Sequence, residues 1–126
     1  MAASMDCTNI SLVRNTGTVC TGTAIGSDTV TLLITPTQSC NKLVLILTST
    51  DAASYTVDIA AGDFWAGTAM TQVTVAQNVP KAFVFESAMN SALQGNTADS
   101  ADAYRIKLTL SAPATTGTSF QVLELP

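Results

Sequence analysis

The feature that most constrains the fold is a two-residue alternation of apolar and polar side chains that recurs along the chain. Between residues 29 and 35, Val30, Leu32 and Ile34 alternate with threonines. Successive side chains of a β-strand point to opposite faces of a sheet, so this alternation is typical of a strand with one buried side. β-Branched residues, which are enriched in strands, carry much of the pattern.

Similar patterns predict about eight short strands separated by turn residues. They fall at residues 10–13, 29–35, 42–48, 55–59, 71–75, 81–85, 104–110 and 120–126. The uninterrupted apolar run from Leu43 to Leu47 predicts a central strand that is covered on both faces. Residues 86–93 favour at most one short helical turn, which Gly95 would close. Many short strands without long crossover helices predict a single antiparallel β-sandwich, jelly-roll or immunoglobulin-like in topology.

The length of 126 residues fits one domain. We assign the β-sandwich to residues 29–126. Residues 15–28 are rich in glycine and threonine, so residues 1–28 are expected to form an N-terminal arm or strand segment ahead of the sandwich.

Composition bears on the partners of the chain. Hydrophobic residues make up 47% and charged residues 11%, the opposite of the balance found in disordered proteins. So few charges indicate a surface that is covered by neighbouring molecules or is rich in threonine and serine. The net charge is -4, and the five basic residues form no run. Nucleic acid and anionic membranes attract clustered lysine and arginine, so neither is expected as a partner.

The N-terminus carries no targeting signal that we recognise. Residues 1–6 lack the basic and apolar regions of a signal peptide. No strongly apolar run approaches the roughly 20 residues that span a bilayer. We therefore expect a soluble chain that is made in a cytoplasm, from which cell lysis could later release it.

The chain contains no histidine, which removes the commonest general base and metal ligand. Asp58 with Asp63, and Asp99 with Asp102, are the carboxylate pairs closest in sequence, but acidic residues in such loops are usually solvated turn formers. Residues 99–102 lack the dense spacing of a calcium loop, and no phosphate-binding glycine pattern follows a strand. We therefore predict no enzyme activity, no catalytic residue, no metal and no cofactor.

Two aromatic segments are candidate contact regions. Phe64 and Trp65 lie in a loop between Gly62 and Gly67. Trp65 could cap the open end of the sandwich, contact another protein, or stack on a sugar. Phe85 and Met89 belong to the second region, which we also expect to make contacts.

The cysteines are an odd set at positions 7, 20 and 40, without a CxxC motif. We expect three reduced thiols, as is usual in chains that are not secreted. One disulfide among them, or a thiol that meets a neighbouring subunit, are the alternatives. Cys7 and Cys20 are therefore included among the candidate contact residues of the N-terminal segment.

From about residue 41 to 126, the chain resembles a family of small bacteriophage virion proteins that are encoded with capsid genes. The resemblance lies in the order of several segments, of which Phe85-Glu-Ser-Ala88 is the most particular. The others are Leu43-Val-Leu-Ile-Leu-Thr48, Tyr55-Thr-Val-Asp-Ile59, Ala60-Ala-Gly-Asp63, Thr71-Gln-Val-Thr-Val75 and Val122-Leu-Glu-Leu-Pro126. The first 40 residues lie outside the resemblance, and residues 90–103 are longer than the family's pattern.

The resemblance implies a head-associated protein that decorates or cements the outside of a bacteriophage capsid. Its partners would be the major capsid protein or other virion proteins, and its location the virion, assembled in the host cytoplasm. Analogy with decoration proteins suggests a homo-oligomer, with a trimer as the expected state. The alternative is a carbohydrate- or cell-surface-binding β-sandwich module in a tail or receptor-binding component, which depends on Trp65.

Overall fold

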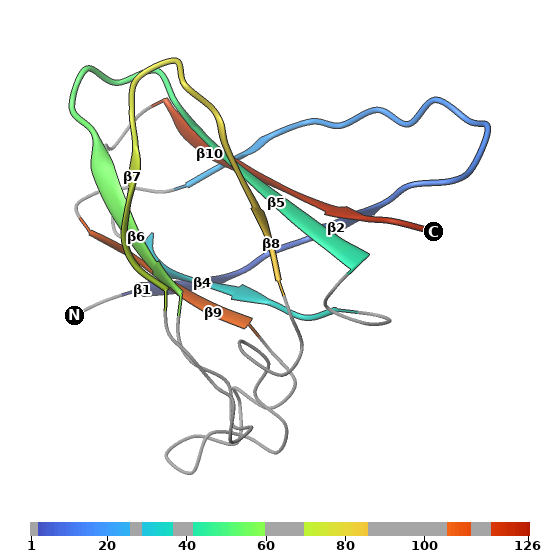
Figure 1. Cartoon of the computed structure of the whole chain (residues 1–126), viewed down its shortest axis with the longest axis horizontal. Coiled ribbons are helices and arrows are strands. Elements are labelled where there is room, and N and C mark those ends of the chain that lie inside the picture. The colour runs from blue at the N-terminus through green and yellow to red at the C-terminus, as the bar shows by residue number, and fades with distance from the viewer. Residues whose placement is uncertain (1–2, 26–28, 37–41, 60–69, 86–105, 112–116) are drawn as a thin grey trace, which may run out of the picture.

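The computed structural model describes residues 3–25, 29–36, 42–59, 70–85, 106–111 and 117–126. Within these residues, ten strands form two sheets that pack against each other as a β-sandwich (Figure 1). The all-β prediction is therefore confirmed. The predicted helical turn at residues 86–93 lies outside the described residues.

Each sheet contains five strands, named here in spatial order. The first sheet comprises β1 (Ala3–Asp6), β4 (Thr29–Ile34), β9 (Ile106–Ser111), β6 (Tyr55–Ile59) and β7 (Met70–Val75). The second sheet comprises β2 (Asn9–Ser11), β10 (Thr118–Glu124), β5 (Leu43–Ser49) and β8 (Lys81–Val84), with β3 (Thr23–Ala24) also paired to β10.

The strand pairs are antiparallel except at the N-terminus, where β1 runs parallel to β4 and β2 runs parallel to β10. The sheets are therefore mixed and not purely antiparallel. Residues 3–11 form one extended segment that crosses from the first sheet to the second at Cys7 and Thr8. The backbone N–H of Cys7 still donates to the Leu33 carbonyl, 2.8 Å away. β1 and β2 belong to the same extended segment, and each runs parallel to its partner strand, β4 or β10.

Alternating side chains from the two sheets fill the core. In β5 and β10, every second residue is buried, and β9 alternates strictly between buried and exposed positions. The core residues include Leu45, Val57, Leu108 and Phe120, each at most 1% exposed. Burial of such side chains is the main source of stability in a domain of this size.

The prediction that β5 is covered on both faces is wrong within the described chain. β5 does lie inside its sheet, between β10 and β8. However, only its inward side chains are buried, and Val44 and Ile46 on the outward face are half-buried. Continuous apolar strands normally have cover on both faces. The cover on the second face of β5 is therefore incomplete in the single chain.

Three turns join at one end of the sandwich. The backbone N–H of Thr50 donates to the Gly117 carbonyl at 3.0 Å, and that of Asn78 donates to the Ser49 carbonyl at 2.8 Å. Gln77 Nε2 donates to the Thr50 carbonyl at 2.9 Å. Asn78 and Gly117 both adopt positive φ, 56° and 80°. These bonds satisfy turn backbone groups and tie the β5–β6 turn to the two neighbouring turns.

Near the opposite ends of β5 and β10, a polar side chain links the two sheets. Asn9 Nδ2, from β2, donates to the Thr35 carbonyl at 2.7 Å and to Glu124 Oε1 at 2.6 Å. Thr35 directly follows β4 of the first sheet, whereas Glu124 ends β10 of the second. Glu124 is 4% exposed, so this contact supplies one of the donors that a buried carboxylate requires.

Tyr55 is expected to tolerate loss of its hydroxyl. The side chain is 2% exposed, and its oxygen finds no hydrogen-bond partner among the described residues. We expect Tyr55→Phe to leave the free energy of unfolding unchanged, or to raise it by up to about 1 kcal/mol, since a buried hydroxyl without a partner is costly. Urea denaturation measures this difference. A loss of more than about 1 kcal/mol would mean that the hydroxyl makes a favourable bond in the folded state.

The same variant has a distinct behaviour at alkaline pH. Burial raises the pKa of Tyr55 to about 12, above its ordinary value of 10. The folded state therefore keeps this proton over a range in which the unfolded chain loses it, and wild-type stability declines as the pH rises from about 10 to 12. Tyr55→Phe removes that part of the decline.

Candidate contact surface

The structure describes three of the six residues that the sequence nominates for contacts. Phe64, Trp65 and Met89 lie outside the described residues. The choice between a core cap, a protein contact and a sugar platform for Trp65 therefore stays open.

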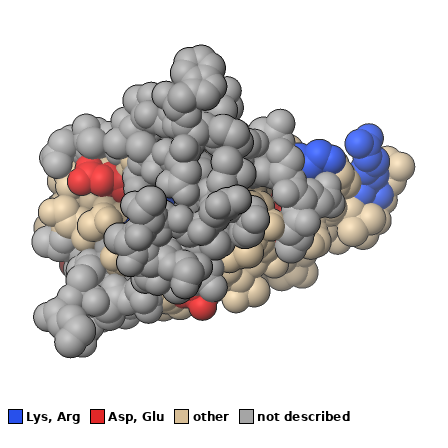
Figure 2. All heavy atoms as spheres, turned by 90° about the horizontal axis from the view of Figure 1, so that it is seen from below, with Lys and Arg blue, Asp and Glu red and all other residues tan. Residues whose placement is uncertain are grey.

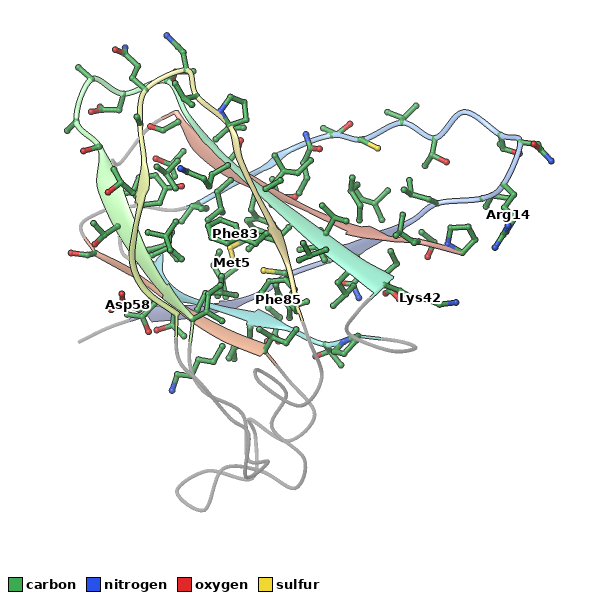
Figure 3. The ribbon with its side chains drawn as sticks, in the orientation of Figure 1. Met5, Arg14, Lys42, Asp58, Phe83 and Phe85 are labelled. Atoms are coloured by element: carbon green, nitrogen blue, oxygen red, sulfur yellow. The ribbon has the colours of Figure 1, made fainter. Side chains whose placement is uncertain are left out.

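Phe85 belongs to the hydrophobic core. It directly follows β8 and is 4% exposed. Figure 3 shows its ring, with Phe83 and Met5, in the space between the two sheets. Phe83 is similarly buried, at 5% exposed. In this position, the Phe85 ring stabilises the sandwich and offers little surface to a partner.

The two described cysteines, Cys7 and Cys20, are both free thiols in contrasting surroundings. Cys7 is half-buried at the crossing between β1 and β2. Burial, and secondarily the charge of Asp6, raises the pKa of the Cys7 thiol to about 12. The thiolate is the reactive form of cysteine, so Cys7 is a poor nucleophile at neutral pH. Cys20 is exposed, and its Sγ lies 3.5 Å from the Thr18 carbonyl oxygen.

The carboxylates considered for chemistry are mostly outside the described residues, which include only Asp58 of the four. Asp58 is half-buried on β6. Within the described part of the chain, no three cysteine and acidic side chains group closely enough to hold a metal ion. The same part of the chain contains no helix of the length and apolarity needed to cross a membrane.

Residues 12–22 form a projecting loop on the edge of the second sheet. The chain leaves β10 after β2, where Ile10 pairs with Leu123, and returns at β3, where Thr23 pairs with Phe120. Figure 1 shows this loop extending well beyond the strands on the side of the C-terminus. Because β5 occupies the other edge of β10, β2 and β3 share one edge and the loop is held at both ends.

The projecting loop exposes apolar side chains. Val13 is 59% exposed and Val19 is 84% exposed. Asn15 adopts a φ of 58°, and Thr16 Oγ1 donates to the Arg14 carbonyl at 3.3 Å. Figure 3 shows Arg14 on the outer part of the loop, at the same end of the molecule as Lys42. Basic side chains are exposed at this end in the view of Figure 2.

The outward faces of the two sheets differ in chemistry. On the first sheet, the described outward positions carry mainly hydroxyl and charged side chains: Thr31, Thr56, Asp58, Thr74, Lys107, Thr109 and Ser111. Leu33 is an exception there, but it is only 8% exposed. A threonine-rich face is the kind of exterior that the composition predicted.

The outward face of the second sheet is mainly aliphatic, with Gln121 of β10, which pairs with Ile46, as a polar exception. One row crosses all four strands, because Ile10 pairs with Leu123, Leu123 with Val44, and Val44 with Val84. Ile46, Ala82 and Leu125 extend this row along the strands. We call these seven residues the aliphatic face. Val84 is 67% exposed and Leu125 is 42% exposed, so the face is open at both positions.

Polar groups bound the aliphatic face at its two ends. Lys42 precedes β5 at one end, where its Nζ donates to the carbonyl oxygen of Pro126 at 3.3 Å. At the other end, the hydroxyls of Thr48 and Ser119 are hydrogen-bonded to each other at 2.6 Å. Sequence analysis did not identify this face. Its signal was the apolar run from Leu43 to Leu47, which predicted cover on both faces of the strand.

Among the described residues, the projecting loop and the aliphatic face are thus the two surfaces where exposed apolar side chains lie together or close by. No protein-family model, curated protein or solved structure matches the chain.

Proposed function

We propose that the chain is a structural protein of a virus particle, which decorates or cements the outside of a bacteriophage capsid through non-catalytic protein–protein contacts. The observation that carries the proposal is the order of the segments that resemble phage virion proteins, from Leu43-Val-Leu-Ile-Leu-Thr48 to Val122-Leu-Glu-Leu-Pro126. In such a role the chain acts in many copies, and weak contacts multiply through avidity.

The architecture supports this proposal. A cement protein needs a rigid module with surfaces that reach its neighbours. The sandwich supplies the module, and the projecting loop of residues 12–22, anchored on β10 at both ends, supplies a surface that extends beyond the strands. Exposed Val13 and Val19 give this loop apolar groups that a partner could bury.

The composition supports a non-catalytic role. A chain without histidine and with 11% charged residues has few groups for acid–base chemistry and a low cost of burial against another protein. The proposed partners are the major capsid protein or other virion proteins, together with further copies of the same chain. The proposed location is the virion, after assembly in the host cytoplasm, and neither nucleic acid nor membrane is a proposed partner.

Purified particles test the proposal. We expect quantitative mass spectrometry to find the chain in stoichiometric proportion to the major capsid protein, because a decorating subunit occupies repeated sites on the shell. An electron-microscopy map of the same particles should show density for it on the outer capsid surface. Particles from a virus with the gene deleted provide the matched control and should lack that density.

Absence of the chain from washed particles would contradict a virion role. Density on the tail, with only a few copies per particle, would instead favour the tail or receptor-binding alternative. That alternative predicts glycan binding that is lost in Trp65→Ala, which a glycan array measures.

A further inference from the structure

The aliphatic face leaves apolar surface uncovered on the second sheet, most of all at Val84 and Leu125, whereas Val44, Ile46 and Leu123 are half-buried. β5, β8 and β10 each place large apolar side chains on both faces: Leu45, Phe83 and Val122 point into the core, while Val44, Val84 and Leu123 point outward. The first sheet instead has mostly threonine and charged residues outward. Apolar rows on one outer face of a sandwich, with a polar opposite face, mark a surface that another molecule covers.

We propose that a second copy of this chain covers the aliphatic face, so that two sandwiches pack second sheet against second sheet. The charge distribution favours this partner. None of the acidic residues that the structure describes lies on the aliphatic face: Asp6 and Asp58 belong to the first sheet, Asp51 to a turn, and Glu124 points inward. For two chains that each carry a net charge of -4, a face free of these carboxylates allows approach with little repulsion.

Lys42 determines how the two copies are oriented. It is the charged side chain at one end of the face, and hydroxyl groups of Thr48 and Ser119 occupy the other end. A two-fold axis parallel to the strands would place Lys42 over its own counterpart, which is repulsive. A two-fold axis across the strands reverses one copy and brings Lys42 toward the hydroxyl end of its partner. In this arrangement β8 faces the partner's β8, and the contact is isologous, as in most homodimers.

The size of the face sets the strength of the contact. With strands about 4.8 Å apart and side chains of one face repeating about every 6.7 Å, each residue covers about 32 Å², so the seven residues of the aliphatic face cover about 220 Å² per copy. A standard interface buries about 800 Å² per partner. The pair is therefore expected to form in a concentration-dependent equilibrium, and sheets packed this way keep their strands within about 30° of alignment.

Sedimentation equilibrium of the purified chain tests the proposal, from low micromolar to about 0.5 mM, where a small interface is expected to associate. We expect wild type to convert from monomer to dimer over this range. Val84→Lys should raise the dimer Kd by about tenfold or more, because it brings two like charges together in an apolar contact. Val84 is largely exposed on an edge strand, so this variant should fold, and circular dichroism with a thermal melt checks that it does.

Thr109→Lys is the matched control. It adds the same charge at an exposed position on the outward face of the first sheet, and it should leave the dimer Kd unchanged. Mixing Val84→Lys with Val84→Glu chains tests the direction of the axis. Because β8 faces the partner's β8, the mixture should form heterodimers more tightly than either variant forms homodimers.

Several results would overturn the proposal. A wild-type chain that stays monomeric throughout the range would do so, as would an oligomer that Val84→Lys does not weaken. A trimer would contradict a two-fold contact, which closes at two copies. The inference does not depend on the proposed virion role, since the isolated chain is measured. A monomeric chain would therefore contradict the dimer but not the virion role, and absence from virions would contradict the virion role but not the dimer.

Discussion

Replacing Asn9 with alanine is expected to lower the free energy of unfolding by about 2 to 3 kcal/mol. The Asn9 amide donates to the Thr35 carbonyl at 2.7 Å and to Glu124 Oε1 at 2.6 Å. Its loss removes a donor from a carboxylate that is 4% exposed, and a buried charged acceptor that loses a donor is more costly than a neutral one. Urea denaturation at neutral pH, analysed with a constant slope, measures the difference.

Ser11→Ala is the matched control for this prediction. Ser11 lies on the same short strand, pairs with Glu124 through the backbone, and is exposed. Its truncation should change the free energy of unfolding by less than about 0.5 kcal/mol. If Asn9→Ala were equally mild, the link between the sheets would contribute little to stability.

Asn9→Asp separates hydrogen bonding from shape. This variant keeps the size of the side chain but replaces the donor with a carboxylate that faces Glu124 and a backbone carbonyl. Repulsion is added to the lost bonds, so Asn9→Asp should be more destabilising than Asn9→Ala. An Asn9→Asp variant as stable as wild type would show that the amide does not donate to Glu124.

Much of the fold could be predicted from local patterns, because each strand must bury one of its faces. The alternation at residues 106–110 and the run at residues 43–47 coincide with β9 and β5. β1 and β3 were missed for a physical reason. Residues 3–6 alternate apolar and polar side chains over only four positions and include no β-branched residue, and Thr23–Ala24 is a two-residue exposed strand. β1 and β3 form only because they pair with the edges of β4 and β10, strands that lie further along the chain.

The aliphatic face was harder to predict, since it depends on which residues become neighbours across strands. The Leu43 to Leu47 run indicated cover on both faces, but not whether this chain or another molecule provides it. The row from Ile10 to Val84 joins four strands from distant parts of the sequence, so no local window contains it. Phe85 is the converse case, because an aromatic residue nominated for contacts lies in the core of the single chain.

The Asn9 link had no sequence signal of its own. Its two ends are 115 residues apart, and neither asparagine nor glutamate is distinctive at such positions. The parallel pairing of β2 with β10 brings them together. Buried polar links of this kind specify a fold after the hydrophobic pattern has selected its class.

Gly117→Ala is the second substitution with a large expected effect, a loss of about 2 kcal/mol in the free energy of unfolding. Gly117 adopts a φ of 80° immediately before β10, a conformation that residues with a side chain rarely adopt. A Cβ at this position would also clash with Thr50 Oγ1. The strain and the clash would both disturb the hydrogen bond that the Thr50 N–H donates to the Gly117 carbonyl at 3.0 Å. Thermal and urea denaturation measure the loss.

A double-mutant cycle separates the two causes. Thr50→Ala removes the hydroxyl oxygen that the new Cβ would meet, while the backbone conformation of Gly117 stays the same. If the contact dominates, Gly117→Ala should lower the free energy of unfolding clearly less in the Thr50→Ala background than in wild type. If backbone strain dominates, the loss should be equal in the two backgrounds.

Gly17→Ala is the control, because a Cβ there would meet no atom within 4 Å beyond its chain neighbours, and the φ of Gly17 is not positive. That substitution in the projecting loop should be neutral or slightly stabilising, and a Gly117→Ala chain as stable as Gly17→Ala would contradict both the strain and the contact.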